Sequence, residues 1–247
     1  MIDVKTEMLP WQPTHPLAKA TSSNNVRSIS WLTSVRSADD WPYRWAKRIL
    51  DVVIASIALL LLWPVLLLIA VAVRLDSPGP ALFRQKRVGR WGREFVLYKF
   101  RSMRQNVDEN ELRAFAKQYI NGHGGPNGQS LFKPHNDRHI TRLGRFLRRT
   151  SLDELPQLLN VLKGEMSLVG PRPVVAYEVA EYDSWHLRRL DVLPGITGLA
   201  QINGRSKLPW KEVVRLDIEY VEKCSFWLDL LILIKTIPVV FSTRSAG

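Results

Sequence analysis

Residues 52–73, VVIASIALLLLWPVLLLIAVAV, form an apolar run without a charged residue in a chain that is otherwise polar and basic. A helix of this run is about 33 Å long, close to the roughly 30 Å hydrocarbon core of a bilayer. The pattern therefore predicts a helix that enters a membrane. Pro64 stands in the middle of the run, where it removes one helical hydrogen bond and clashes with the preceding turn, so we expect a kink or a break there.

Basic residues flank this run on both sides. They are Arg44, Lys47 and Arg48 before it and Arg74, Arg84, Lys86 and Arg87 after it. A helix that spans the bilayer should show a bias, because Lys and Arg collect on the cytoplasmic side. The symmetry favours a re-entrant helix that bends at Pro64 and leaves by the face through which it entered. One ordinary spanning helix with a tolerated proline is the alternative.

The remaining pattern predicts a mixed α/β protein that is mainly helical and carries one short β-hairpin. After a turn at 77–80, residues 81–103 are typical of short strands joined by a glycine-containing turn. We expect helices at 106–119, 153–163, 173–191 and 209–223, and a flexible loop at 121–130. The apolar tail 226–241 is too short to span, so it either lies in the membrane interface or closes the core.

These elements divide the chain into three parts. Residues 1–43 are polar and rich in proline near their start, which predicts a disordered tail. Residues 44–76 are the predicted re-entrant membrane helix, and residues 77–247 the predicted catalytic domain on the cytoplasmic side, with interfacial C-terminal helices. The protein is thus expected to be monotopic.

Composition narrows the range of partners. Lys and Arg number 35 against 23 Asp and Glu, a net charge of +12, which suits anionic lipid, nucleic acid or phosphorylated substrates. Cys224 is the single cysteine, which excludes an internal disulfide. The five histidines show no paired zinc spacing.

The segment 148–164, RRTSLDELPQLLNVLKG, holds adjacent carboxylates at the start of a predicted helix. Ser151 and Glu154 have capping-box spacing, but Pro156 belongs in a first turn and favours Asp153 as the N-cap. Capping alone accounts for both acids. The functional alternative uses the same place, since a helix N-terminus and nearby arginines favour an ionised carboxylate that attacks a substrate or binds a metal.

Two further groups of residues suit anions. Arginines and lysines crowd residues 84–104 and 138–149, where most are expected to be solvated or to face lipid headgroups and a minority to bind phosphate. The turn-rich segments VGPRP (169–173) and PGITGLAQINGR (194–205) contribute Arg172 and Arg205. Gly and Pro in such turns let backbone N–H groups approach a ligand.

Several long motifs, in order, match one known family. They are KRILD (47–51), SPGPALFRQKRVG (77–89), YKFRSM (98–103), RRTSLDELPQLLNVLKGEMSLVGPRP (148–173) and PGITGLAQINGR (194–205). From about residue 44 to its C-terminus the chain resembles the bacterial sugar transferases, also called monotopic phosphoglycosyl transferases. The resemblance implies an enzyme that moves a sugar-1-phosphate from a UDP-sugar to polyprenyl (undecaprenyl) phosphate, releases UMP and initiates exopolysaccharide or other surface glycan synthesis.

The resemblance also implies residue roles, a cofactor and a location. It implies a phospho-Asp intermediate on Asp153, Mg²⁺ held by Glu154, and a catalytic domain on the cytoplasmic face of the bacterial inner membrane. The substrate- and phosphate-binding residues that it implies are Lys99, Arg148, Arg172 and Asp217, and the residues at the membrane entrance are Lys47, Arg48 and Asp51. The re-entrant helix with its central proline agrees with the argument from Pro64. The family often has Ser before this proline, whereas this chain has Trp63.

Other readings stay open at this point. The charge of +12 also suits a membrane-tethered nucleic-acid-binding protein, although Trp91 is the one aromatic residue among the arginines. A non-catalytic membrane adaptor with the same fold is a third reading, against which the intact Asp153–Glu154 pair argues. We expect UDP-sugar, polyprenyl phosphate and membrane lipid as partners and no nucleic acid. Galactose or glucose is favoured as the sugar, and homo-oligomerisation is left open.

Overall fold

The computed structural model describes residues 41–103, 109–120, 139–204 and 208–241. Residues 1–40 of the predicted tail 1–43, the loop 121–130 and Arg205 lie outside these residues, whereas residues 41–43 of that tail are helical. The helices of eight residues or more are α2 (Trp41–Asp76), α3 (Glu109–Ile120), α4 (Arg142–Thr150), α9 (Trp210–Lys223) and α10 (Phe226–Phe241). The shorter α-helices are α5 (Leu158–Lys163), α6 (Ala176–Val179), α7 (Ser184–Leu187) and α8 (Leu199–Asn203). The 3₁₀ turns are η3 (Arg90–Gly92), η5 (Leu152–Gln157) and η6 (Arg188–Leu190).

Two small sheets accompany these helices. Strands β1 (Leu82–Val88) and β2 (Glu94–Phe100) pair antiparallel, with Leu82 opposite Phe100, which confirms the predicted hairpin. Strands β3 (Ser167–Val169) and β4 (Gly195–Thr197) pair in parallel and were not predicted. Each of these two strands is too short to show a period of two, so the pattern of the sequence does not predict them.

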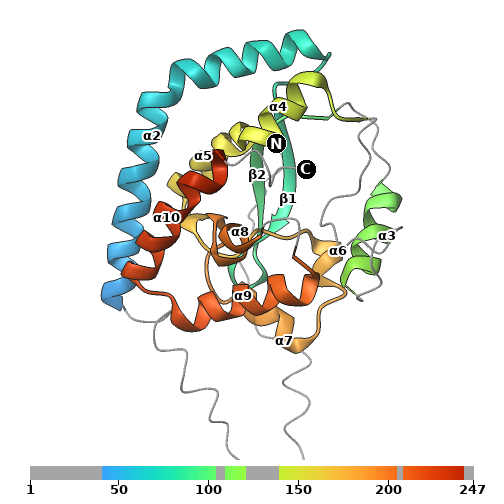
Figure 1. Cartoon of the computed structure of the whole chain (residues 1–247). Coiled ribbons are helices and arrows are strands. Elements are labelled where there is room, and N and C mark those ends of the chain that lie inside the picture. Colours follow the sequence, from blue (N-terminus) through green and yellow to red (C-terminus); the bar gives the residue numbers. More distant parts are fainter. Residues whose placement is uncertain (1–40, 104–108, 121–138, 205–207, 242–247) are drawn as a thin grey trace, which may run out of the picture. The chain divides into compact units, whose positions relative to one another are not determined.

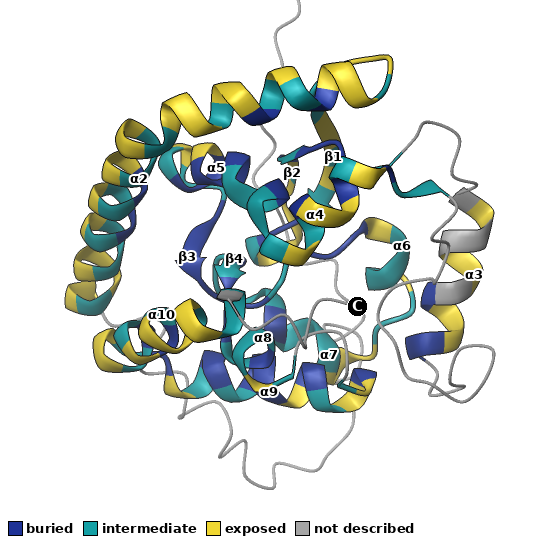
Figure 2. Ribbon diagram, turned by 45° about the horizontal axis from the view of Figure 1, so that its top comes forward, coloured by how far each residue is buried: buried dark blue, intermediate teal, exposed yellow. Residues whose placement is uncertain are grey.

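The longest helix, α2, contains the whole apolar run. Among the described residues it is the one helix that is long and apolar enough to cross a membrane, and 11% of its most apolar window is buried. Large side chains such as Leu60 and Leu61 are 73% and 70% exposed. Figure 2 shows the exposed residues along this helix, so α2 is not the core helix of a soluble protein.

Pro64 lies inside α2, which is continuous helix from Trp41 to Asp76. In Figure 1 the ribbon of α2 bends part-way along its length instead of ending. A helix accommodates an internal proline by bending, because the ring displaces one carbonyl of the preceding turn. The re-entrant path through a membrane stays a prediction.

The core lies between the first half of α2 and the elements that follow the hairpin. Ala55 of α2, Val161 of α5 and Ile232 of α10 are fully buried in one cluster, together with Tyr220 of α9. Burial of apolar surface contributes about 25 cal/mol per Å², so this cluster is the main source of stability for the described unit. The helices predicted at 106–119 and 209–223 correspond to α3 and α9, and the one predicted at 153–163 forms as the 3₁₀ turn η5 followed by α5. The apolar tail 226–241 is the helix α10.

The single helix predicted over 173–191 is wrong. The segment forms three short pieces, α6, α7 and η6. A turn before Asp183 separates α6 from α7, and η6 follows α7 directly. The backbone N–H of Asp183 donates to Nδ1 of His186 at 3.1 Å, which closes the start of a new helix. Such local hydrogen bonds compete with a continuous helix and restart it in a new direction.

The candidate active site

A cavity of about 370 Å³ opens among β2, η5, β4, α8, α9 and α10. Its charged lining residues are Lys99, Arg148, Asp153, Glu154, Arg172, Arg189 and Asp217. Except for Arg189, these are residues that the sequence analysis singled out. Residues of α10, among them Leu233 and Val240, form part of an apolar wall. The cavity thus combines charged groups of both signs with an apolar surface.

Asp153 faces a lysine. Its carboxylate Oδ2 lies 2.8 Å from Nζ of Lys99, and the Asp153 side chain is 4% exposed. Lys99 is on β2 and Asp153 is on the 3₁₀ turn η5. These two elements pack against each other. A buried carboxylate in such a pair is positioned for chemistry and shielded from water.

The prediction that Asp153 is a helix N-cap is wrong. The reason lies at Ser151, whose φ of 58° and ψ of 14° end α4 in a left-handed conformation. Because α4 ends there, the 3₁₀ turn begins at Leu152 and Asp153 stands inside it. Its side chain is therefore directed to Lys99 instead of to backbone N–H groups.

Glu154 is paired with a different cation. Its Oε1 accepts a hydrogen bond from Nη2 of Arg172 at 3.1 Å. The negative charge of Glu154 raises the pKa of the Arg172 guanidinium, against the opposing effect of burial, so Arg172 stays charged. The two adjacent acids thus have two separate basic partners, one on β2 and one after β3.

Asn160 sets the distance between these elements. Its fully buried amide accepts from the backbone N–H of Tyr98 at 3.1 Å and donates to Val96 O at 2.7 Å and to Glu165 Oε2 at 2.6 Å. These contacts fasten α5 to β2, the strand that carries Lys99. The sequence analysis missed Asn160, although an Asn inside an apolar helical stretch is a signal of such a role.

A second buried pair borders the cavity behind Arg172. Arg189 donates through Nη2 to the carboxylate of Asp217 and to the carbonyl of Arg172, and through Nη1 to Tyr182 Oη at 2.9 Å. Burial raises the pKa of Asp217 to about 6, and the attraction of Arg189 opposes this rise. Arg189 was missed because an Arg–Arg doublet in a predicted helix does not show which arginine is buried.

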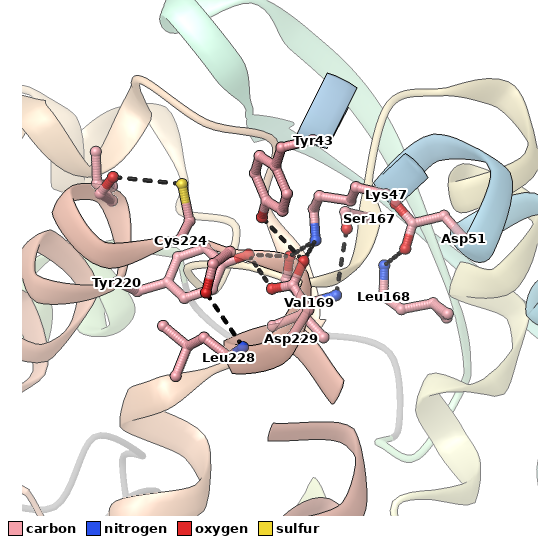
Figure 3. A network of polar contacts seen from close by, with 12 residues as sticks. Tyr43, Lys47, Asp51, Ser167, Leu168, Val169, Tyr220, Cys224, Leu228 and Asp229 are labelled. Carbon is pink, nitrogen blue, oxygen red and sulfur yellow. Dashed lines mark hydrogen bonds and ion pairs between the residues drawn. The ribbon is translucent and has the colours of Figure 1, made fainter. Parts of the chain in front are cut away.

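Lys47, Arg48 and Asp51 attach α2 to the domain. Lys47 Nζ donates to Val169 O at 3.0 Å and to Asp229 Oδ2 at 2.8 Å, as Figure 3 shows. Arg48 donates to the carbonyls of Val161 and Leu162 at the C-terminal end of α5, and Asp51 accepts from the backbone N–H of Leu168 at 3.0 Å. Their expected role in membrane anchoring stays a prediction.

The acids of the site fit a magnesium ion only as a single carboxylate ligand beside substrate phosphates. The described residues contain no group of three or more His, Cys, Asp or Glu side chains that could hold a metal ion. Mg²⁺ is commonly bound by one or two carboxylates together with substrate phosphates, because it retains several waters. Glu154 fits as such a single ligand, provided that a diphosphate supplies further oxygens.

Comparison with known proteins now places the chain. Residues 42–243 match the family model described as "Bacterial sugar transferase". The chain belongs to this family. It is 44% identical over 196 residues to the galactosyl transferase CpsE of Streptococcus agalactiae, and 44% identical over 209 residues to a UDP-glucose:undecaprenyl-phosphate glucose-1-phosphate transferase of Xanthomonas campestris. Family membership confirms the resemblance drawn from the motifs.

The coverage of these relatives differs. The matches include 79% and 81% of this chain but 42% and 40% of the two relatives, so the chain spans about two fifths of their length. The exopolysaccharide production protein ExoY of Rhizobium meliloti is 43% identical over 201 residues, which are 81% of this chain and 88% of that protein. The site residues described above all lie within the segment that the family model matches.

Proposed function

We propose that this protein transfers a hexose-1-phosphate from a UDP-sugar to undecaprenyl phosphate, with release of UMP, as the first step in building an exopolysaccharide or another surface glycan. One observation carries the proposal: the buried Asp153 and its neighbour Glu154, each paired with a cation, line a cavity that also has an apolar wall. The names of relatives support the reaction, since they include a UDP-glucose:undecaprenyl-phosphate glucose-1-phosphate transferase and an undecaprenyl-phosphate galactose phosphotransferase.

The placement of the two acids supports a reaction in two steps. Asp153 attacks the donor phosphorus that carries the sugar, a bond forms between its carboxylate oxygen and phosphorus, and the bond to UMP breaks. A phosphate oxygen of the lipid then attacks the same phosphorus, and the Asp153–phosphorus bond breaks to restore the carboxylate. Neither step needs an external proton donor, and the two substrates use one site in turn.

The cationic side chains lower the repulsion between the reacting anions. Lys99 lies on Asp153 and is positioned to take a phosphate oxygen when the carboxylate becomes esterified. Arg148 and Arg172 line the same cavity and suit paired hydrogen bonds to phosphate. Mg²⁺ bound at Glu154 would supply further neutralisation of phosphate charge. These groups are fixed before the substrates arrive, which is the condition for electrostatic stabilisation of a transition state.

The membrane helix places this site at the lipid surface. The exposed apolar face of α2 and the contacts of Lys47, Arg48 and Asp51 support a catalytic domain held against a bilayer. We propose that α2 bends at Pro64 and re-enters the cytoplasmic face of the inner membrane. Reporter fusions at the two ends of the chain are then both expected in the cytoplasm. Fusions on opposite sides would instead show a spanning helix.

The chemistry is tested with the purified full chain, undecaprenyl phosphate, Mg²⁺ and UDP-sugars, by measuring UMP release. Asp153→Asn is expected to lower turnover by at least about a thousandfold, because an amide oxygen is a poor nucleophile. With a labelled donor and no acceptor, the unchanged protein should carry a sugar-phosphate label and the variant should carry none. Substantial turnover by Asp153→Asn would contradict the covalent step.

Asp183→Asn is the matched control for this variant. Asp183 is the N-cap of α7, its side chain is 87% exposed, and it does not line the cavity. Asn is as good an N-cap as Asp, so the substitution should preserve the start of the helix. It is expected to release UMP at the rate of the unchanged protein. A nucleic-acid-binding protein or a non-catalytic adaptor would release no UMP with any donor.

A further inference from the structure

One amide of helix α8, that of Gln201, lines the cavity without a hydrogen-bond partner among the described residues. Its two polar atoms, Oε1 and Nε2, are buried, and neither forms a hydrogen bond to any described residue. Gln201 is nevertheless one of the residues that line the cavity. A buried amide without partners is unfavourable, and such groups are uncommon in folded proteins. Groups that enter the cavity can supply the missing partners of Gln201.

A hydroxyl on the same wall is also available to a ligand. Thr236 Oγ1 donates to Ile232 O at 2.7 Å, and it lies 2.7 Å from Thr197 Oγ1. Since the Thr236 proton is used on the carbonyl, Thr197 is the donor in the contact between the two hydroxyls. The Thr197 oxygen then keeps its acceptor capacity on the cavity side. Gln201 and Thr197 together offer two N–H donors and two acceptor oxygens.

These neutral groups differ in chemistry from the rest of the site. Lys99 and Arg172 are paired with acids and suit the phosphates of a donor. A primary amide beside a hydroxyl suits a neutral partner that both donates and accepts hydrogen bonds, which describes the hydroxyls of a sugar. A nucleobase is usually bound by stacking on an aromatic ring, and no aromatic residue is among the described residues that line the cavity.

We propose that Gln201, with Thr197 beside it, binds hydroxyl groups of the donor's hexose. This inference rests on the proposed function. It assigns the sugar to the wall formed by β4 and α8, and the phosphates to the charged residues of β2, η5 and the segment after β3. Because glucose and galactose differ in the orientation of one hydroxyl, loss of the amide changes the discrimination between them.

A structural role for Gln201 is the competing explanation. Gln201 is the third residue of α8, where a Gln can reach back to the N-cap N–H, here that of Gly198. A Cβ on Gly198 would lie 2.8 Å from Oε1 of Gln201, so the amide is close, yet the hydrogen bond is not made. Glu suits the same helix position, so Gln201→Glu keeps the helix start and replaces the N–H donors with an acceptor.

The test measures kcat/KM for UDP-glucose and UDP-galactose with undecaprenyl phosphate, using the full chain in detergent or nanodiscs. Gln201→Glu and Thr197→Val are expected to lower kcat/KM for the preferred sugar by about tenfold or more, and to change the ratio between the two sugars by at least about fivefold. Asn203→Ala is the control, because Asn203 is on the same helix, is exposed and bonds only to Leu199 O. It should leave both values within about twofold of the unchanged protein.

Each other outcome is informative. Equal losses for both sugars, with the ratio unchanged, would overturn the proposal and indicate a structural role. A change in discrimination between UDP- and CDP-glucose without a change between hexoses would place the nucleobase on this wall instead, and would also overturn it. If the unchanged protein releases no UMP from any of the UDP-sugars, the proposed function itself fails, which is a separate result.

Discussion

Individual arginines in this chain have different roles, and their spacing in the sequence does not show which role each one has. Arg101, within the basic stretch 84–104, is buried and donates to the carbonyls of Val73, Ser77 and Pro78 at the C-terminal end of α2. Arg48 does the same for α5. Both arginines donate to carbonyls at the C-terminal end of a helix, where Lys and Arg side chains commonly bind. Arg101 is thus one residue of the basic stretch that faces neither solvent nor lipid.

Cys224 is a residue whose environment makes a direct prediction. It is buried, and burial raises the pKa of its thiol to about 11. At pH 8 about one thousandth of such a thiol is ionised, and the thiolate is the reactive form. We expect maleimide to leave Cys224 unmodified in the folded protein at pH 8 and to label it once per chain in denaturant. Labelling of the folded protein at the rate of a free thiol would contradict the buried placement.

Among the elements, the parallel pair of β3 and β4 places a strict requirement on sequence. Gly195 approaches Gly170 so closely that an added Cβ would lie 2.1 Å from the Gly170 backbone N. Two residues after Gly170 stands Arg172, the partner of Glu154. The glycines of the two turn-rich segments therefore allow the close approach of two backbones, which places Arg172 at the cavity.

Gly195→Ala is expected to destabilise the protein by about 3 kcal/mol or more, because the backbone of Gly170 cannot move away without breaking the sheet. Turnover should fall with it, since Arg172 is displaced. Gly92→Ala is the control: its φ is 77°, but nothing lies within 4 Å of the added Cβ. Its cost should be about 1 kcal/mol, from the left-handed backbone alone. Chemical unfolding in detergent compares the two, and equal losses would argue against the close approach.

In the whole described unit, Asp229 joins segments that are far apart in the chain. Its carboxylate accepts from Tyr43 Oη at 2.9 Å, Lys47 Nζ at 2.8 Å and Tyr220 Oη at 2.7 Å. Figure 3 shows these side chains meeting between α2, α9 and α10. The same contacts hold the N-terminal half of the membrane helix on the domain that contains the cavity. The exposed side of α10, with Trp227 75% exposed, lies away from this network.

Asp229→Asn is expected to destabilise the protein by about 3 kcal/mol, because it breaks the ion pair of Lys47 in a largely buried position. Limited proteolysis should then release α2 more rapidly from the domain. Glu222→Gln breaks an ion pair with Arg188 at the surface and should cost less than about 1 kcal/mol. If both variants unfold at the same denaturant concentration, Asp229 does not join the two parts.

Local patterns in the sequence were enough to predict the elements that have strong periodicity or clear turn residues at their ends. The apolar run predicted α2, the Gly-containing turn predicted the β1–β2 hairpin, and the motifs around Asp153 predicted the family. The same motifs pointed to Lys99, Arg148, Arg172 and Asp217, which the structure brings to one cavity. Each of these signals lies within a short stretch of chain, so no distant contact was needed to recognise it.

Contacts between distant segments decided the rest. The partner of Asp153, the burial of Arg189, the unpaired amide of Gln201 and the β3–β4 pair depend on segments tens of residues apart. Residue type alone does not separate a solvated arginine from a buried one, because burial depends on which surface meets it after folding. The sequence by itself determined the long apolar helix, the hairpin and the family. Only the tertiary structure decided which charges pair and which polar groups are left for a substrate.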